Sequence, residues 1–247
     1  MRTTAIVCLL LLCAVPLVQA GGVAANPTRP TFSDNAHPMA KGYLEFELGG
    51  HFWEHDQFGL PFLLKLGLAD PIEFKLGGEG FRYNGVSEEF GFSNLGLFIK
   101  GRFLEQRGMT PAMGILGAVI LPTASHDLHE RTTDLGLLFL MTGQFGPMSW
   151  DFNTGIRFLR LDSDHTFMDI PAILALSARI VGPLGVVMEV ADYIPLDDQD
   201  NALHLLGAIT WAFTPRLILD FAFVKGFDAA PSWEVHFGFT TTLARLW

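Results

Sequence analysis

The sequence predicts an all-β protein: an antiparallel transmembrane β-barrel of about 12 strands that follows a cleaved N-terminal signal peptide. Apolar and polar residues alternate from Lys41 onward, and a period of two is typical of strands whose faces meet different surroundings. The chain is 49% apolar, with a mean hydropathy of +0.32. The apolar windows at 109–122 and 168–190 are too short or too interrupted for a spanning helix. A closed barrel is the other structure that satisfies its backbone polar groups within a bilayer.

The first 20 residues have the features of a secretory signal peptide. Arg2 precedes a long apolar run, and the run ends in small residues at Ala20. Both cysteines, Cys8 and Cys13, lie inside it, so the mature chain is expected to have no disulfide. A lipoprotein anchor at Cys13 is less favoured because the apolar run continues beyond it.

Residues 21–40 are rich in Pro, Ala and Asn and show no periodicity. We expect an extended N-terminal segment here, a candidate plug, followed by the transmembrane barrel at 41–247. The strands are expected near 42–54, 59–69, 71–83, 91–104, 110–122, 133–146, 148–161, 167–181, 184–194, 202–213, 216–226 and 233–247. An even number of strands fits a bacterial barrel with both termini on the periplasmic side.

The connections between these strands alternate in character. Every second one is short and contains a proline, and the others are longer and polar. The prolines are Pro71, Pro111, Pro147, Pro183 and Pro215. Short periplasmic turns that alternate with longer outer loops are typical of outer-membrane barrels.

A secreted soluble barrel would show the same alternation with its apolar face turned inward. Three features favour the membrane: one face is almost continuously Leu, Phe, Ile and Val, the charges on the other face are sparse and mixed in sign, and aromatic residues lie near strand ends. We therefore expect a porin-like protein in the outer membrane of a Gram-negative bacterium, with membrane lipids and the barrel-assembly machinery as partners.

The last strand is expected to close the barrel against the first. Val235 and Phe237 would face lipid, and Arg245 falls on the same register, near the periplasmic interface where Trp247 ends the chain. A terminal strand that ends on an aromatic residue resembles the signal that the barrel-assembly machinery reads.

The polar face of the strands is expected to line the lumen. The residues assigned to it are Glu45, Glu47, His51, Lys65, Glu73, Lys75, Glu79, Lys100, Arg102, Asp151, Asn153, Arg157, Arg179, Glu189, Asp192, His204, Asp220, Glu234 and His236. The alternative is a network of paired charges that simply fills the barrel, since unpaired buried charges are costly. Twelve strands predict a narrow lumen, crossed by salt bridges such as those from the Glu-rich first strands to Lys100 and Arg102.

Two strands depart from strict alternation. In 110–122 and 133–146, apolar Leu116, Ile120, Leu138 and Leu140 fall on the inward side. This is either a surface on which residues 21–40 pack as a plug or an apolar stripe for a ligand, and packing is the favoured interpretation.

Catalytic and metal sites have little support in the sequence. His126 and His129 lie in an expected outer loop without a recognisable ligand pattern, so no metal or cofactor is predicted. Ser125 and His126 are adjacent, but no GxSxG or comparable hydrolase motif surrounds them. We therefore predict that the protein is not an enzyme. The net charge of −10 argues against nucleic acid as a partner.

The residues TRPTFSDNAHPMAKGYLEFELG, at 28–49, resemble the opening of a family of outer-membrane proteins assigned to the meta-pathway of phenol degradation, often called transporters. The matching positions are Arg29, Pro30, Phe32, Asp34, Lys41, Gly42, Leu44 and Glu47. The stretch that ends in LPTAS is similar to the middle of the family, with Ala124 in place of its Gly and Thr28 in place of the usual acid. The resemblance implies a barrel for uptake of aromatic or other apolar compounds and assigns no binding residues.

From these observations we expect a channel that passively admits small, apolar or aromatic compounds. One alternative is a closed structural or adhesive barrel without transport. A less favoured alternative is an outer-membrane lipid hydrolase, which would use Ser125 and His126.

Overall fold

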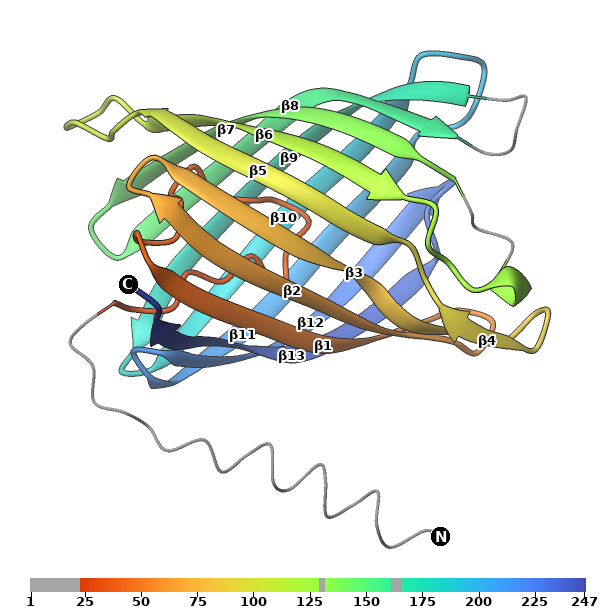
Figure 1. Ribbon diagram of the computed structural model, residues 1–247, viewed down its shortest axis with the longest axis horizontal. Coiled ribbons are helices and arrows are strands. Elements are labelled where there is room, and N and C mark those ends of the chain that lie inside the picture. Colours follow the sequence, from red (N-terminus) through yellow and green to blue (C-terminus); the bar gives the residue numbers. More distant parts are fainter. Residues whose placement is uncertain (1–22, 129–131, 161–165) are drawn as a thin grey trace, which may run out of the picture.

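Figure 1 shows a closed antiparallel β-barrel in the computed structural model, which describes residues 23–128, 132–160 and 166–247. The signal peptide predicted for residues 1–20 lies outside these ranges. The strands are β1 (Tyr43–Trp53), β2 (Gln57–Ala69), β3 (Ile72–Asn84), β4 (Glu89–Phe92), β5 (Leu95–Leu104), β6 (Ala112–Leu121), β7 (Asp134–Phe145), β8 (Met148–Arg160), β9 (Thr166–Val181), β10 (Leu184–Pro195), β11 (Ala202–Thr214), β12 (Leu217–Asp228) and β13 (Trp233–Arg245). A short 3₁₀ helix, η1 (His126–Leu128), follows β6.

The ring of strands has 12 positions, although 13 strands are named. Both β4 and β5 pair with β3, separated by Ser93 and Asn94, so they occupy one position. Each other strand pairs with its neighbours in the chain, and β1 pairs with β13 to close the ring. The predicted antiparallel barrel of about 12 strands is therefore confirmed. No helix among the described residues is long and apolar enough to cross a membrane.

The two faces of the wall differ as the alternation predicts. In β12, Phe221 is 48% exposed whereas the next residue, Ala222, is fully buried, and Phe223 and Val224 repeat the contrast. The exposed face is apolar in every part of the barrel, with large side chains such as Phe103, Leu137 and Trp211 pointing outward. Many of the buried side chains are charged. A barrel with this arrangement places its apolar surface toward lipid.

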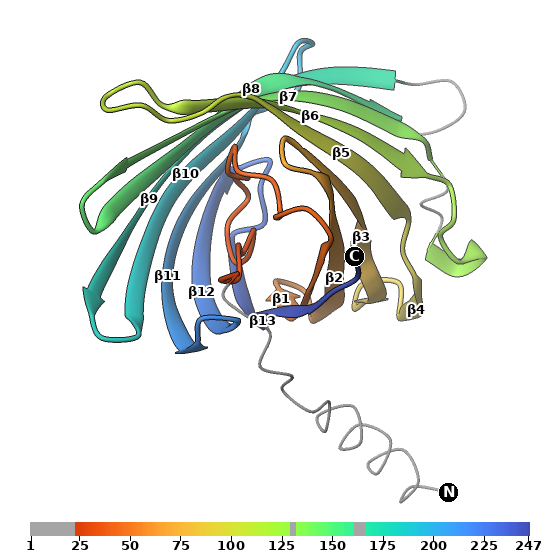
Figure 2. The ribbon, with the colours of Figure 1, turned by 60° about the vertical axis from the view of Figure 1, so that its left-hand side comes forward.

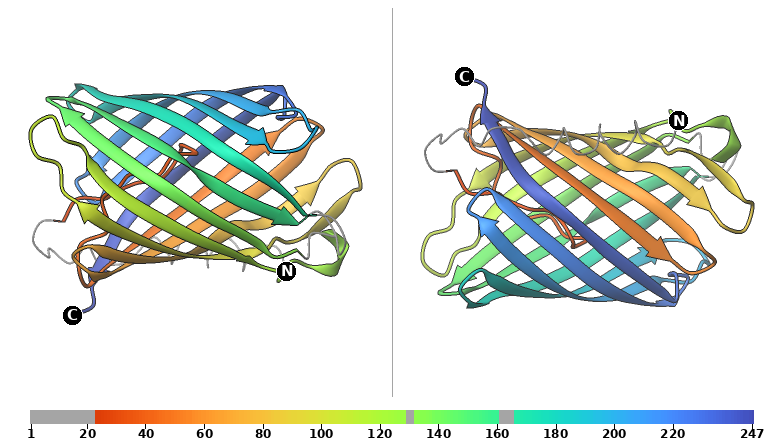
Figure 3. Two further views of the ribbon diagram at one scale, coloured as in Figure 1. Left: turned by 90° about the horizontal axis from the view of Figure 1, so that it is seen from above. Right: turned by 90° about the horizontal axis from the view of Figure 1, so that it is seen from below.

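Most short connections lie at the end where the C-terminus is found and where the N–H of Ala25 donates to the carbonyl of Pro215 (Figure 3). We call this the terminal end, and the opposite end is the loop end. At Gly146-Pro147 and Gly182-Pro183 the chain reverses within two residues. Gly146 and Gly182 have φ values of 58° and 53°, which glycine adopts without a steric penalty. Four of the five connections at this end have two residues, but 105–111 has seven, and the loop end includes the three-residue turn 54–56, so the predicted alternation of short and long connections holds only in part.

Residues 23–40 run inside the barrel before β1 begins (Figure 2). They have no helix or strand, yet Ser33, Asp34, Ala36 and Met39 are buried. We call residues 23–40 the inner segment.

The register predicted for Arg245 was wrong. Tyr43 pairs with Arg245 and Leu44 with Ala244, but Glu45 pairs with Thr242, so Leu243 is an extra residue in β13. This bulge shifts Arg245 to the face of Tyr43, and its guanidinium lies 5.9 Å from the centre of the Tyr43 ring. A β-bulge re-aims the side chains beyond it, which strict alternation cannot anticipate.

Candidate functional site

The side chains assigned to the lumen mostly lie on the buried face of the wall. The buried ones are Glu45, Glu47, Lys65, Glu73, Lys75, Lys100, Asn153, Glu189, His204, Asp220, Glu234 and His236. His51, Arg102, Asp151, Arg157 and Asp192 are partly buried. The side chain of Glu79 is 46% exposed but lies 3.5 Å from His51. Arg179 is exposed and lines a recess of about 460 Å³ near the terminal end.

The inner segment is held by its backbone, and carboxylates of the wall accept its N–H groups. Glu45 accepts from Asn26 at 2.8 Å, and Glu47 of β1 accepts from Thr28 at 2.8 Å and from Arg29 at 3.2 Å. Ionised acceptors make stronger hydrogen bonds than neutral ones, so this wall binds an extended chain without another strand.

The opposite part of the wall holds the middle of the inner segment. Glu189 of β10 accepts the N–H groups of Phe32 and Ser33, at 2.7 and 2.9 Å. Asn153 of β8 accepts the N–H of Asp34 at 2.7 Å and donates to the carbonyl of the same residue at 2.8 Å. An amide side chain carries both an acceptor oxygen and donor N–H groups, so Asn153 satisfies both backbone groups of Asp34.

Two further contacts complete the attachment. Thr142 of β7 accepts the N–H of Ala36 at 2.8 Å and donates to Asp151 at 2.5 Å. Glu73 of β3 accepts the N–H of Met39 at 2.5 Å. Side chains of β1, β3, β7, β8 and β10 therefore bind the backbone of the inner segment at intervals between Asn26 and Met39.

A network of ion pairs crosses the buried face beside the inner segment. Lys65 pairs with Glu45 at 3.2 Å and with Glu47, and it donates to the carbonyl of Asn26 at 2.7 Å. Lys100 pairs with Glu73, also at 3.2 Å. The expected bridge from the first strands to Arg102 was wrong, because Arg102 pairs with Glu105 and contacts His37.

Asp34 supplies the inner segment's own charge to this network. It pairs with Lys75 and, at 3.2 Å, with Lys100. Burial opposes its ionisation, but Lys100 and Lys75 outweigh that effect and lower the pKa of Asp34 well below its usual range. Without Asp34, the two lysines would share the single carboxylate of Glu73. Asp34 thus binds the wall through its backbone and neutralises Lys75 and Lys100 through its carboxylate.

His37 marks the edge of the network. Its Nδ1 lies 3.3 Å from a guanidinium nitrogen of Arg102, which can only donate, so this ring nitrogen accepts. Burial, together with the charges of Arg102 and Lys100, lowers the pKa of His37. The neutral imidazole is therefore the form that fits here.

Arg29 occupies a notch formed by two glycines of the wall. Its guanidinium donates to the carbonyl of Phe237 at 3.0 Å and pairs with Asp220 at 3.4 Å. A Cβ atom on Gly49 would lie 2.2 Å from the guanidinium carbon, and one on Gly238 would lie 2.6 Å from Nε. Only residues without a side chain leave room for Arg29 at this position.

The apolar inward stripe of β6 and β7 contacts the inner segment. Leu116 and Leu140 form a buried cluster with Ala36 and Ala112, against which Phe98 and Leu138 pack. Beside this cluster is a cavity of about 250 Å³. Its apolar lining consists of Phe32, Leu63, Phe98, Leu116, Leu138, Pro171, Ile173 and Tyr193, and its polar lining of Thr28, Asp34, Lys75 and Arg157.

The cavity and the cluster adjoin, so the stripe packs against the segment and also borders an open volume. Arg157 closes one side of it, paired with Asp169 and lying 4.1 Å from the centre of the Tyr193 ring. The stripe therefore fits both interpretations made from the sequence. The inner segment packs on Leu116 and Leu140, and Leu116 and Leu138 also border the cavity, where an apolar ligand would have room.

The loop predicted as a weak hydrolase candidate has a structural role. Ser125 Oγ accepts the N–H of Phe92 at 2.8 Å, and its own N–H donates to the carbonyl of Phe92 at 2.7 Å. These bonds fix the loop to β4. His129 lies outside the described residues.

Arg29 and Asp34 were missed from the sequence, and so was the convergence of three residues that were each assigned to the lumen. The buried charge of Asp34 and the cradle of Arg29 were not assigned to the lumen, although both lie in the segment that resembles the family. A group of His51, Glu234 and His236 also converges on the wall. The sequence signal for it was the presence of these residues on the inward face of the first and last strands.

Comparison with known proteins gives one family match. The model of the family described as "Putative MetA-pathway of phenol degradation" matches residues 39–235. None of the curated proteins compared with the chain is a significant sequence match.

Several solved structures share the fold. The COG4313 outer membrane channel from Pseudomonas putida F1 has a TM-score of 0.65 and 12% identity, covering 86% of this chain and all of that one. The KdgM porin has a TM-score of 0.60 and 5% identity, covering 81% of this chain and 99% of its own. The NanC porin has a TM-score of 0.60 and 8% identity, covering 80% and 98%. These similarities are to outer-membrane barrels.

Proposed function

Because the chain belongs to the family described as "Putative MetA-pathway of phenol degradation", we propose that it is an outer-membrane channel for passive uptake of small apolar or aromatic compounds. The observation that carries the proposal is the cavity between the inner segment and the apolar stripe. A solute of one ring fits a volume of about 250 Å³, near the lower limit of ligand pockets. We place the protein in the outer membrane of a Gram-negative bacterium. Its proposed partners are the lipids of that membrane and the barrel-assembly machinery.

The wall chemistry supports an apolar rather than a sugar-like or anionic solute. Phe98, Leu116, Leu138 and Ile173 line one side of the cavity, and the charged groups nearby are already engaged in ion pairs. Asp34 and Lys75 pair with each other, and Arg157 pairs with Asp169. A polar solute would have to displace these partners, whereas an apolar solute gains from burial against the stripe.

The inner segment restricts the path and is proposed to act as a plug. Its attachment combines main-chain hydrogen bonds with the Asp34 ion pairs, and hydrogen bonds to charged groups contribute about 1.5–3 kcal/mol each. Several of these bonds would have to break together for the segment to leave the lumen. Permeation is therefore proposed to occur beside the segment, through the cavity, and not by its release.

The alternative is a closed structural barrel, and it is supported by the same bonds between the inner segment and the wall. If the inner segment never moves and the cavity connects to neither mouth, the barrel conducts nothing. We propose no catalysis, since the candidate nucleophile Ser125 is held by two hydrogen bonds to Phe92.

The experiment compares the full mature chain with a variant that lacks residues 23–40. Both are reconstituted into liposomes whose outer leaflet contains lipopolysaccharide, and the initial uptake of radiolabelled phenol is measured together with planar-bilayer conductance. We expect the full chain to accelerate phenol uptake above empty liposomes with small conductance, and the deletion to raise conductance. Phenol uptake equal to that of empty liposomes for the full chain would leave the closed barrel as the better interpretation.

A further inference from the structure

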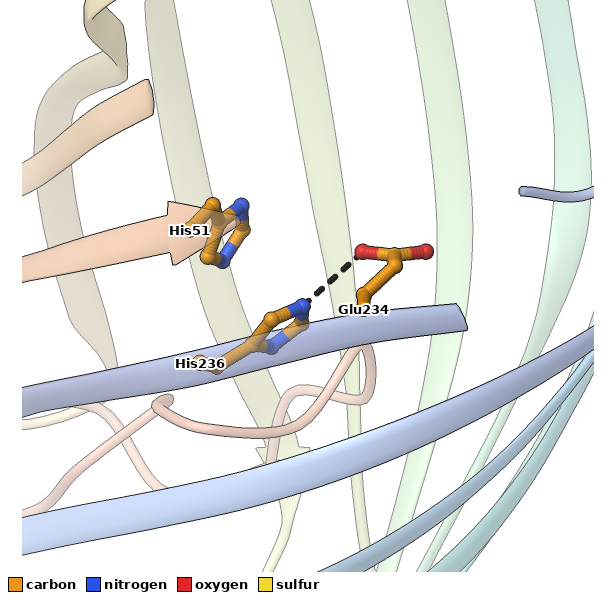
Figure 4. A group of neighbouring side chains, drawn as sticks. All are labelled: His51, Glu234 and His236. Carbon is orange, nitrogen blue, oxygen red and sulfur yellow. Dashed lines mark hydrogen bonds and ion pairs between the residues drawn. The ribbon is translucent and has the colours of Figure 1, made fainter. Parts of the chain in front are cut away.

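We propose that His51, Glu234 and His236 form a binding site for a divalent transition-metal ion, with Zn²⁺ as the best match, on the inner wall of the barrel (Figure 4). The site is separate from the cavity and does not depend on the transport function. It lies at the seam that closes the ring, because His51 of β1 and His236 of β13 are direct cross-strand partners. Glu234 shares their face two residues earlier in β13.

The three residues already converge. One ligand atom from each lies within 4.8 Å of the other two. The imidazole rings of His51 and His236 are stacked, with centres 3.8 Å apart, and Nε2 of His236 lies 2.9 Å from Glu234. Zn²⁺ binds nitrogen and carboxylate oxygen at about 2.0–2.2 Å, so modest rotations of these side chains bring the three atoms onto one ion.

His236 lies between a carbonyl and a carboxylate. Its Nδ1 lies 3.4 Å from the carbonyl oxygen of Pro30, and its Nε2 lies 2.9 Å from a carboxylate oxygen of Glu234. Either ring nitrogen can carry the proton of a neutral imidazole. In the tautomer with the proton on Nδ1, the lone pair of Nε2 points toward Glu234, which is the arrangement that a shared metal ion needs.

The charge of Glu234 leads to the same conclusion. It is buried, and the ion pairs found among the described residues give it only histidine partners, His204 and His236. Among the other buried carboxylates near the inner segment, Glu45 and Glu73 have lysine partners and Asp220 has Arg29, whereas Glu189 accepts backbone N–H groups. Since an uncompensated buried carboxylate is costly, a divalent ion would supply the missing positive charge.

Each proposed ligand also has an outer partner that can orient it. Nδ1 of His51 lies 3.5 Å from Glu79, the second oxygen of Glu234 lies 3.6 Å from His204, and His236 contacts the carbonyl of Pro30. Such contacts fix the ring orientation and the tautomer of metal-binding histidines. With His51 turned toward Glu79 through Nδ1, its Nε2 is the nitrogen left for the metal.

The ligand set selects the class of ion. Two imidazole nitrogens and one carboxylate oxygen match three-ligand Zn²⁺ sites that keep a fourth position for water. Imidazole also suits Cu²⁺ and Ni²⁺, whereas Ca²⁺ and Mg²⁺ prefer sites made only of oxygen. The site would also tie the wall to the inner segment, because the ring of Phe32 lies 4.8 Å from that of His204 and 5.9 Å from that of His236.

The test is Zn²⁺ binding to the folded mature barrel in detergent, by calorimetry, with Co²⁺ absorption as a second readout. We expect one bound ion per chain and visible Co²⁺ bands from a nitrogen- and oxygen-bound ion. His51→Gln and His236→Gln should each weaken Zn²⁺ binding by about 100-fold or more, since losing even an outer partner costs 10–100-fold. His55→Gln, in the exposed turn after β1, is the matched control and should bind as the parent does.

Glu234→Gln keeps the shape of the side chain and guards against a folding defect in the histidine variants. It should also weaken Zn²⁺ binding and alter the Co²⁺ spectrum. Absence of binding by the parent chain would overturn the proposal. So would binding that survives His51→Gln combined with Glu234→Gln, because the ion would then be held by other residues. Either result leaves the phenol-uptake experiment unaffected.

Discussion

Oδ1 of Asp34 lies 3.2 Å from Nζ of Lys100, inside the barrel and 66 positions away in the chain. Lys75 contacts the other oxygen of the same carboxylate. A carboxylate from a segment without secondary structure therefore neutralises two lysines of the wall. The inner segment therefore contributes to the charge balance of the barrel. Removing the segment would enlarge the lumen and would also leave Lys75 and Lys100 without the carboxylate of Asp34.

Asp34→Asn is expected to loosen the inner segment. The amide has the same shape but leaves Lys75 and Lys100 with Glu73 as their shared carboxylate, and breaking a buried ion pair costs about 3–5 kcal/mol. Planar-bilayer recordings should show larger or more frequent conducting states, and proteolysis should cut the segment faster. Asp198→Asn, in an exposed loop, is the control; equal behaviour of the two variants would contradict the role of Asp34.

Asn153→Leu tests the main-chain attachment alone. Leucine fills a similar volume but leaves the N–H and the carbonyl of Asp34 without their partner in β8. Each unsatisfied buried group costs about 1–3 kcal/mol. Hydrogen exchange at the Asp34 amide should accelerate, whereas Thr154→Val, the next residue on the other face of β8, should leave it unchanged. Equal protection in both variants would mean that Asn153 does not hold the segment.

Gly49→Ala is expected to displace Arg29. The new methyl group would overlap the guanidinium, with 2.2 Å to its central carbon, so Arg29 would have to move. Asp220 would lose its arginine. Thermal unfolding in detergent should occur at lower temperature than in the parent chain. Gly101→Ala is the matched control, because a Cβ there meets nothing within 4 Å. Equal unfolding temperatures for the two variants would show that the notch does not contribute to stability.

Acid is expected to loosen the inner segment in two stages. His37 has a lowered pKa, so its unfolded form takes up a proton first, and stability is lost as the pH falls below about 6.5 toward the lower folded pKa. Asp34 also has a lowered pKa. Its contribution is complete above its ordinary pKa of about 4 and is lost as the pH falls through the lower folded value.

Conductance measured against pH checks this sequence of events. His37→Gln should remove the first stage and keep the second, and Asp34→Asn should remove the second. A single transition that neither variant moves would assign the pH response to other groups.

Leu138→Gln tests the apolar path. A polar amide in the lining of the cavity lowers the gain from burying an aromatic solute, and loss of apolar contact of this kind costs about 1–3 kcal/mol. Phenol uptake into liposomes should fall severalfold while ion conductance stays the same. Thr210→Asn, on the inner face outside this cavity, should leave phenol uptake unchanged; a parallel fall in both variants would place the path elsewhere.

The barrel was predictable from the sequence because each strand carries its own signal. In β12, for example, the order Leu219, Asp220, Phe221 already shows the alternation of apolar and polar residues. The lipid on one side of the wall requires an apolar residue at every second position. The break between β4 and β5 at Ser93 and Asn94 and the bulge at Leu243 were not predictable, since one or two irregular residues leave no periodic signal.

The interior was less predictable because its contacts join distant residues. The period of two places Glu189 and Asn153 on the inward face, but it does not indicate that they bind Phe32 and Asp34. His51 and His236 were assigned to the inward faces of the first and last strands. Their stacking depends on the register of the seam, which hydrophobic alternation determines only to within two residues.

The attachment of the inner segment also has a mechanical consequence. In the ring of 12 positions, β1 lies diametrically opposite β8, and β3 lies opposite β10. Of the first pair of strands, Glu47 of β1 holds Thr28 and Asn153 of β8 holds Asp34. Of the second pair, Glu73 of β3 holds Met39 and Glu189 of β10 holds Phe32. The segment is thus a cross-brace along two diameters, which resists flattening of the cylinder under lateral pressure from the bilayer.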